Sequence, residues 1–402
     1  MSTSAVLADH EVTQDSEGEL VSLDFELSED QTMIRDEVRR YAEERIAPGT
    51  AERDRDHEFP QEIIQELGEL GLLGMMVDEK HGGAGLDPVT YCLAVEELSR
   101  ICPATAVTMS VSNSVACWPI DHFGNEELKS TVLQELASGE CIGGFGLTEP
   151  GSGSDAASMR TTAVRDGDHW VLQGEKAWIT NAGFARYYVV LAKTDPDAGK
   201  RGITAFVVPA DAEGFSVGTP EEKLGLRASR TAPIYFEQVR IPASWMLGEL
   251  GKGLNLALAT LDHSRLGIAA QAMGEHRRAL ELAISYAKER EQFGRPIADF
   301  QAIRFQLAEI AVELEAARTL TLYAASLPHG HKDAGRLASE AKVYASEAAN
   351  RAVWKSLQIH GGNGYCEDYE IARLYRDVRV TTIYEGTSEM QRLVISRHVL
   401  NG

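Results

Sequence analysis

The class of fold is decided by the stretch GLNLALATLDHSRLGIAAQAMGEHRRALELAISYAKER, residues 253–290. Alanine and other apolar residues recur there three and four positions apart, which predicts one long helix. Asp299 to Ala325 and Asp333 to His360 repeat the pattern, and Gly361-Gly362 supplies a natural helix end. Helices of this length bury their apolar stripes best against one another, so we expect an antiparallel helical bundle over residues 244–402.

Residues 141–243, immediately before this bundle, carry a strand pattern. Short alternating or β-branched runs are separated there by glycine and proline. Thr161 to Val164 and Trp170 to Leu172 flank Asp166-Gly167, which predicts a hairpin. We expect an antiparallel sheet or barrel. Its further strands would be Ala177 to Thr180, Tyr187 to Ala192, Ile203 to Val208 and Ile234 to Phe236.

Residues 24–140 are predicted to form a helical domain. Ser28 and Gln31 make a capping box, and apolar residues follow at helical spacing as far as Pro48. Further helices are expected from Pro60 to Leu73, from Asp87 to Ile101 and from Asn125 to Ala137. Residues 1–23 look like an acidic, disordered tail. The predicted fold class is therefore α+β, mainly α, with a middle β-domain between two helical domains.

The charge balance excludes several classes of function. The 402 residues include 39 Lys+Arg and 61 Asp+Glu, which gives a net charge of −22, so nucleic acid is not an expected partner. No apolar run approaches the roughly 18–20 residues that span a bilayer. Five scattered cysteines and eleven histidines show no metal-ligand spacing, so we expect no metal. The acidic start lacks targeting patterns, so the cytoplasm is the expected location.

The glycine-rich segments do not fit the common nucleotide folds. Gly144-Phe145-Gly146 lacks the third glycine of the dinucleotide fingerprint, because Glu149 stands at that position. A phosphate-binding loop lysine and a nucleophile elbow are also missing from the sequence. A Rossmann enzyme, a P-loop NTPase and an α/β-hydrolase are therefore not expected.

Three short motifs are ambiguous when each is taken alone. The loop from Thr148 to Asp155 exposes backbone N–H groups and hydroxyls that suit a polar ring, although it can equally be a plain turn. Trp178 to Asn181 can be a strand with one core tryptophan. Ser388 and Gln391 form a capping-box pattern, so Glu385 precedes a helix N-terminus, where a solvated carboxylate is common.

Taken together, the motifs resemble the flavin-dependent acyl-CoA dehydrogenases. The short-chain (butyryl-CoA) members are the most similar, through Leu261 to Ala269 and Glu389 to Ile395. The resemblance implies N-terminal helices, a middle β-domain and a C-terminal four-helix bundle. The matching segments are Thr148 to Asp155, Trp178 to Asn181, Arg290 to Gly294, Gln358 to Tyr365 and Ile383 to Gln391.

The resemblance implies an enzyme of fatty acid β-oxidation. It would desaturate an acyl-CoA to the trans-2-enoyl-CoA with FAD as cofactor and pass electrons to electron-transfer flavoprotein, as a homotetramer. Glu385 matches the family's catalytic base. A glutamate in this role needs a pKa raised by a closed, apolar site, because an ordinary carboxylate is too weak a base.

The resemblance also assigns the remaining site residues. Arg265 is the clearest local cation for the anionic substrate, and its alternative is a residue on the bundle surface. For the flavin ring and ribityl chain the residues are Phe145, Leu147, Thr148, Ser154, Trp178 and Thr180. For the rest of FAD they are Arg290, Gln292, Phe300 and Gln301 toward a neighbouring subunit, with Gln358, Gly361, Gly362, Thr387 and Glu389. For the acyl-CoA they are Ser154, Asp262, Arg265 and Gly386.

Departures from the family pattern narrow the choice of substrate class. Ser264 stands near the position where isovaleryl-type relatives carry their base, and a serine cannot serve. Ala106 stands where glutaryl-type relatives place an arginine, which disfavours a dicarboxylyl substrate. The alternatives are the same chemistry on branched, medium-chain or alicyclic acyl-CoAs, an oxidase, and a non-catalytic or nucleic-acid-associated flavoprotein of this fold. The direction of the reaction stays open.

Overall fold

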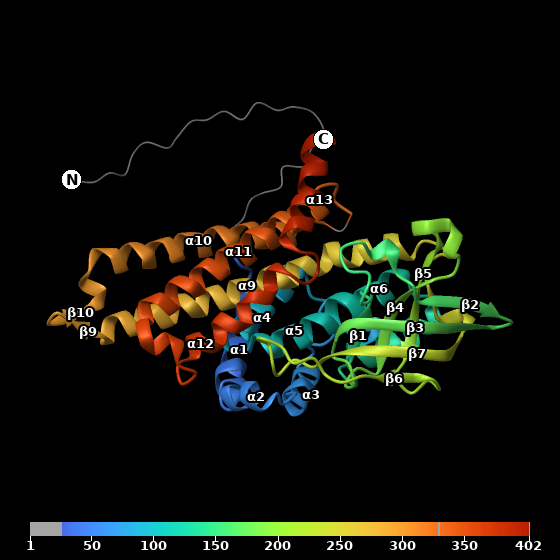
Figure 1. The fold of residues 1–402 in the computed structure, drawn as a ribbon, viewed down its shortest axis with the longest axis horizontal. Coiled ribbons are helices and arrows are strands. Elements are labelled where there is room, and N and C mark those ends of the chain that lie inside the picture. Colours follow the sequence, from blue (N-terminus) through green and yellow to red (C-terminus); the bar gives the residue numbers. More distant parts are fainter. Residues whose placement is uncertain (1–25, 329, 402) are drawn as a thin grey trace.

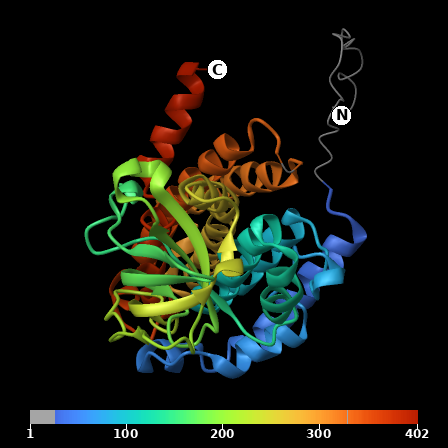
Figure 2. The ribbon, with the colours of Figure 1, turned by 90° about the vertical axis from the view of Figure 1, so that its right-hand side faces the viewer.

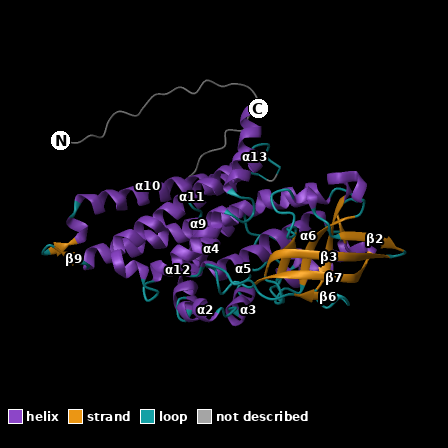
Figure 3. Cartoon of the chain, in the orientation of Figure 1, coloured by secondary structure: helices purple, strands orange, loops and turns teal. Residues whose placement is uncertain are grey.

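A computed structural model describes residues 26–328 and 330–401 of the chain (Figure 1). The long helices run the length of an elongated body, and the sheet lies at one end of it (Figure 3). This arrangement confirms the predicted fold class, in which helices precede and follow a middle sheet. The predicted acidic tail, residues 1–23, lies outside the described residues.

The N-terminal helices begin at the predicted capping box. The Gln31 N–H donates to Ser28 Oγ, and the Ser28 N–H donates to Gln31 Oε1, both at 3.1 Å. The helix predicted from Pro60 ends four residues early, at Glu69, just before Gly71 takes a φ of +75°. The elements are α1 (Glu29–Tyr41), α2 (Thr50–Asp56), α3 (Gln61–Glu69), α4 (Pro88–Ile101), α5 (Pro103–Val111), α6 (Trp118–Phe123), α7 (Glu126–Leu128) and α8 (Gln134–Ala137).

The middle sheet is largely antiparallel, with the strand order β6-β7-β3-β2-β4-β5-β8. It departs from the prediction at β1, which pairs in parallel with β4. Parallel pairing is possible because the β2–β3 hairpin lies between the two strands in sequence and provides the long connection that parallel strands need. The strands are β1 (Gly143–Gly146), β2 (Thr162–Asp166), β3 (His169–Thr180), β4 (Tyr187–Lys193), β5 (Ile203–Pro209), β6 (Phe215–Val217), β7 (Thr231–Pro242) and β8 (Met246–Leu247).

The three predicted long helices are confirmed to within two residues. They are α9 (Gly253–Glu289), α10 (Gln301–Ser326) and α11 (Ala334–His360), followed by α12 (Glu370–Asp377) and α13 (Ser388–Asn401). Viewed almost along α9, the sheet lies on one side and the N-terminal helices on the other (Figure 2). A small hairpin of β9 (Glu291–Gln292) and β10 (Arg295–Pro296) joins α9 to α10. Within the described ranges, no helix is both long and apolar enough to cross a membrane.

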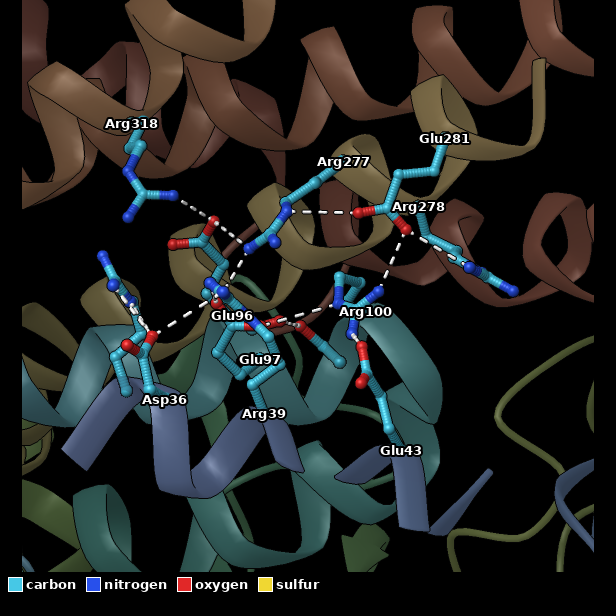
Figure 4. A network of polar contacts seen from close by, with 12 residues as sticks. Asp36, Arg39, Glu43, Glu96, Glu97, Arg100, Arg277, Arg278, Glu281 and Arg318 are labelled. Atoms are coloured by element: carbon cyan, nitrogen blue, oxygen red, sulfur yellow. Dashed lines mark hydrogen bonds and ion pairs between the residues drawn. The ribbon is translucent and has the colours of Figure 1, made fainter. Parts of the chain in front are cut away.

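A buried ionic centre joins four of these helices (Figure 4). Glu96 and Glu97 of α4 have no exposed surface. Arg39 of α1 and Arg277 of α9 each donate to Glu97 at 2.8 Å, and Arg318 of α10 donates to Glu96 at 2.5 Å. Burial alone would raise the pKa of Glu97, but the hydrogen bond from Arg39 and the charge of Arg277 hold that pKa below its ordinary value.

We predict that Glu97→Ala lowers the free energy of unfolding by about 3 kcal/mol, because it leaves arginine charges without their buried partner. Chemical unfolding followed by circular dichroism would measure the loss. Glu37→Ala is the control, since Glu37 and its partner Arg40 are both exposed, and it should change stability little. Equal losses in the two variants would contradict the structural role of the buried centre.

Candidate active site

Glu385 lies in a turn of unusual backbone conformation immediately before α13. Its φ is +51°, and the φ of the following Gly386 is +93°. Glycine adopts such angles freely, whereas a residue with a side chain is strained by about 1–2 kcal/mol. Residues held in this way are concentrated at functional sites, so the turn is a candidate for the chemistry.

Two buried side chains hold the turn by its carbonyl groups. Lys342 Nζ on α11 donates to the Gly386 carbonyl at 2.8 Å. Gln391 Nε2 on α13 donates to the same carbonyl at 2.9 Å and to the Glu385 carbonyl at 3.2 Å. Neither Lys342 nor Gln391 has exposed surface. The turn is therefore fixed from two helices at once.

The expected capping box at the start of α13 does not form. Ser388 is already inside the helix, and its buried Oγ has no hydrogen-bond partner within the described part of the chain. Thr387 takes the capping position instead, since its Oγ1 accepts from the Met390 N–H at 3.4 Å. The amide of Gln391 is thereby available to hold the turn of Glu385.

The surroundings of the Glu385 carboxyl have opposite effects on its pKa. Burial raises its pKa above the ordinary value, while a hydrogen bond from Ser264 Oγ and the charges of Lys342 and Arg265 act to lower it. Burial is the largest of these effects, so the pKa remains raised. A carboxylate in this state takes up a proton more readily than an ordinary glutamate.

The two predicted substrate residues on α9 form an ion pair in which Arg265 is buried and Asp262 is partly exposed. Arg265 is 4% exposed and donates to Asp262 and, at 3.0 Å, to Ser339 Oγ. The alternative that Arg265 is a bundle-surface residue is therefore wrong. Its Nε is buried without a hydrogen-bond partner among the described residues, which leaves one donor available beside the turn of Glu385.

The loop from Thr148 to Asp155 is shaped by an ion pair in which both side chains are buried. Glu149 is 6% exposed and accepts a hydrogen bond from the buried Lys176 at 2.7 Å. The same carboxylate accepts from the Arg160 N–H at 2.5 Å and the Thr161 N–H at 2.9 Å. Glu149 is therefore a structural clamp, which explains why an acid stands where a nucleotide-binding loop would need glycine.

Trp178 is displayed on the surface rather than packed in a core. It lies at a bulge in β3, has a φ of +62° and is 59% exposed, so the alternative of a core tryptophan is wrong. The Ala177 N–H donates to the Thr148 carbonyl at 2.9 Å, which places the end of β3 beside the end of β1. The predicted ring-binding residues Phe145, Leu147, Thr148, Trp178 and Thr180 are therefore close together.

This arrangement fits the flat, polar ring of FAD. The indole of Trp178 is exposed, and nothing within 4 Å would meet a side chain added at Gly151 or Gly153. The loop therefore has room for a ligand to approach its backbone. Ser154, predicted for both the flavin and the acyl-CoA, is exposed on the same loop.

The remaining predicted FAD residues are in two other places. Thr387 and Glu389 line an open cavity of about 430 Å³ together with Arg351 and Arg379. A second group lies at the opposite end of the molecule from the sheet (Figure 1). It comprises Arg290, Gln292, Phe300 and Gln301 around the β9–β10 hairpin, with Gln358, Gly361 and Gly362 at the end of α11.

One chain does not bring these groups together. Ser264, which contacts Glu385, and Arg290, which ends α9, are separated by 26 residues, or about 39 Å of helix. A ligand bound at Trp178 would therefore not reach the far group of the same chain.

Several residues of the site were not predicted from the sequence. Ser264 was considered only as a failed base and Gln391 only as part of a capping box, and Lys342 and Lys176 were not considered at all. Lys342 did carry a signal, since it is a single lysine on a stripe of small residues that includes Ala338, Ala341 and Ala345. A charge on such a stripe indicates a buried partner.

Comparison with known proteins gives matches along nearly the whole described chain. Models of the N-terminal, middle and C-terminal domains of acyl-CoA dehydrogenases match residues 28–140, 144–239 and 251–400. An acyl-CoA dehydrogenase of Bacillus subtilis (strain 168) is 48% identical over 376 residues, covering 94% of this chain and 99% of the relative.

Two further proteins have more specific names. The mitochondrial short-chain specific acyl-CoA dehydrogenase of Bos taurus is 48% identical over 375 residues, covering 93% of this chain and 91% of the relative. The solved structure of butyryl-CoA dehydrogenase from Megasphaera elsdenii superimposes with a TM-score of 0.92 at 41% identity. That superposition covers 94% of this chain and 100% of the other.

We predict that Gly386→Ala destabilises the protein by about 1–2 kcal/mol more than Gly294→Ala does. Both glycines have positive φ, but an added Cβ at Gly386 would lie 2.7 Å from Gln391 Nε2, whereas nothing lies within 4 Å at Gly294. Displacing the buried Gln391 would break its two hydrogen bonds, each worth about 1 kcal/mol. Chemical unfolding measures the difference, and equal losses would show that Gln391 does not hold the turn.

Proposed function

The chain belongs to the acyl-CoA dehydrogenase family, and on this basis we propose that it desaturates short, straight-chain acyl-CoA thioesters with Glu385 as the base. It is an oxidoreductase, and its cofactor is FAD. The observation that carries the proposal is the partly buried Glu385 carboxyl, which has a raised pKa and is held on a strained turn. The names of the bovine and Megasphaera relatives support the short chain length.

Glu385 would remove the α-proton of the thioester. Its Oε2 accepts the hydrogen bond from Ser264, which leaves Oε1 to receive the proton. Burial raises the pKa of the carboxyl, so the proton binds more strongly than to an ordinary glutamate, and the charges of Lys342 and Arg265 limit that rise. The two cations thereby favour the ionised form that accepts the proton, while burial strengthens the binding of the proton once it is transferred.

The β-hydrogen leaves as a hydride, which FAD accepts when bound. The flavin ring would be held by residues at the ends of β1 and β3, namely Phe145, Leu147, Thr148, Trp178 and Thr180. The Glu149–Lys176 pair would keep the adjoining loop in shape. Thr387 and Glu389 would bind further along the cofactor. For the acyl-CoA, we propose contacts from Ser154, Asp262, Arg265 and Gly386.

We further propose a homotetramer, arranged as a dimer of dimers, in which each FAD is shared between subunits. The distance along α9 between the site of Glu385 and Arg290 supports this arrangement, because the far group cannot reach the same chain's ring site. We also propose that the chain consists of three domains, with boundaries near residues 140 and 243.

We propose that electrons leave to electron-transfer flavoprotein in the cytoplasm. Residues Cys92, Cys102, Cys117, Cys141 and Cys366 are all free thiols in the described structure, which is consistent with a reducing compartment. Ala106 in a buried position of α5 offers no charge to a distal carboxylate, which supports a monocarboxylyl substrate.

Anaerobic addition of acyl-CoAs to the yellow holoenzyme tests the reaction. We expect butyryl-CoA to bleach the flavin absorbance fastest, with rates falling as the chain lengthens. Bleaching should rise with pH through the raised pKa of Glu385, because only the ionised carboxylate removes the proton. Preferred bleaching by isobutyryl-, isovaleryl-, octanoyl- or glutaryl-CoA would replace the proposed substrate class.

Glu385→Gln should retain FAD and lose at least about a thousandfold of the bleaching rate, because the amide cannot accept the proton. Glu367→Gln is the matched control, since Glu367 is exposed and remote from the turn, and it should bleach like the wild type. Near-normal bleaching by Glu385→Gln would disprove the assignment of the base.

Arg290→Ala tests the sharing of FAD between subunits. We expect the variant to lose FAD during gel filtration, seen as a lower ratio of flavin to protein absorbance, although Arg290 lies far from Trp178 in its own chain. Arg240→Ala, at another exposed arginine on the sheet, should retain the cofactor. Full retention of FAD by Arg290→Ala would argue against a shared site.

A further inference from the structure

Lys342 is a cation enclosed in the protein interior. Its side chain has no exposed surface, and its neighbours along α11 include Ala338, Ala341 and Ala345. Within the described residues, its ammonium makes one hydrogen bond, to the Gly386 carbonyl at 2.8 Å. A buried ammonium with a single partner is unfavourable, so its presence requires an explanation beyond packing.

The environment of Lys342 leaves it charged at neutral pH. Burial lowers the pKa of the ammonium to about 8, and the charge of Glu385 acts against this decrease. Because that pKa is still above 7, most molecules carry the positive charge beside the turn. Lys342 therefore remains a cation close to the proposed base.

We propose that Lys342 positions Glu385: its ammonium holds the Gly386 carbonyl and with it the left-handed turn, and its charge keeps the neighbouring carboxylate ionised. The proposal rests on the proposed function in taking Glu385 as the base. Lys342 is a positioning residue, because it acts through the Gly386 carbonyl and the turn.

Charged and titratable groups face Lys342 and Glu385 from every element that packs against them. Two cations, Lys342 and Arg265, lower the pKa of the Glu385 carboxyl, and Lys342 has the larger effect. Arg265 already has a carboxylate partner in Asp262, whereas Lys342 donates no hydrogen bond to a carboxylate within the described residues. The full set is Arg265 and Asp262 from α9, Glu347 from α11, Glu389 from α13, Tyr91 from α4 and Tyr384 from the turn.

Two different roles of Lys342 predict different results. If it only stabilised the fold, its removal would weaken the protein and leave the pH dependence of the reaction unchanged. If its charge keeps Glu385 ionised, removal would raise the pKa of Glu385 and shift the acidic side of the activity profile to higher pH. The turn would retain Gln391 as a second donor to the Gly386 carbonyl, so the variant should still fold.

The first experiment compares the pH profiles of kcat/KM for butyryl-CoA in the wild type, Lys342→Met and Lys355→Met. Lys355 lies on the same helix and pairs with Glu309 at the surface, so it is a matched control. We expect the acidic side of the profile to move to higher pH by about one unit in Lys342→Met, with no shift in the control. On that side, kcat/KM of Lys342→Met should therefore be about tenfold lower than that of the wild type. Coincident profiles would overturn the proposal.

Lys342→Gln and Lys342→Arg separate the charge from the hydrogen bond. The glutamine can still donate to the Gly386 carbonyl but carries no charge, so it should show the same shift as the methionine. The arginine keeps the charge and should restore a profile close to that of the wild type. A wild-type profile in Lys342→Gln would overturn the role of the charge.

A second experiment does not need turnover. The thermal midpoint of the holoenzyme is measured from pH 5 to 7 for the wild type, Lys342→Met, Glu385→Gln and the double variant. Since the pKa of Glu385 is raised in the folded state, stability falls as pH rises from the unfolded pKa through the folded one. Lys342→Met should extend that fall to higher pH.

This effect should disappear when Glu385 is replaced by glutamine, because no titrating carboxyl is then left for Lys342 to act upon. An equal effect of Lys342→Met in both backgrounds would overturn the coupling. If no acyl-CoA bleached the wild type, the proposed function would fail, whereas the coupling between Lys342 and Glu385 would still be decided by these four midpoints.

Discussion

The rest of the structure depends on two carboxylates that α4 carries into the protein interior. Glu96 and Glu97 are neutralised by arginines of α1, α9 and α10, which meet them at hydrogen-bond distance. A buried charge without such partners would destabilise the fold, so these contacts fix where α9 lies on α4. Because α9 also carries Ser264 and Arg265, the ionic centre determines the surface against which the turn of Glu385 rests.

The turn itself is stable because contacts from distant parts of the chain offset its backbone strain. A left-handed glutamate costs about 1–2 kcal/mol. Each of the hydrogen bonds that Lys342 and Gln391 donate to the turn is worth about 1 kcal/mol net, which is of the same size. The carboxyl is consequently held toward Ser264 on α9, and a partly buried acid is kept in one place and one orientation.

Local patterns predicted the long helices and most of the strands, but not the shorter elements α5, α12 and β1, and not the contacts between elements. The periodicity of residues 253–290 gave α9 nearly to the residue, and the motif around Glu385 identified the candidate base. The bond between Ser264 and Glu385 joins positions 121 residues apart, and the bond between Lys342 and Gly386 spans 44, so no local spacing encodes either. The parallel pairing of β1 with β4 was missed for the same reason, since it depends on packing after the chain has turned back.

Two buried lysines organise the two loops that flank the proposed site. Lys176 holds the loop of Glu149, and Lys342 holds the turn of Gly386; burial lowers the pKa of each ammonium to about 8. Loops without secondary structure would otherwise sample many conformations, and a buried ammonium selects the one that satisfies its donors. The difference lies in the partner. Lys176 is neutralised by its own carboxylate, whereas Lys342 binds a neutral carbonyl, so its charge remains to act on Glu385, the acid with the largest electrostatic effect on it.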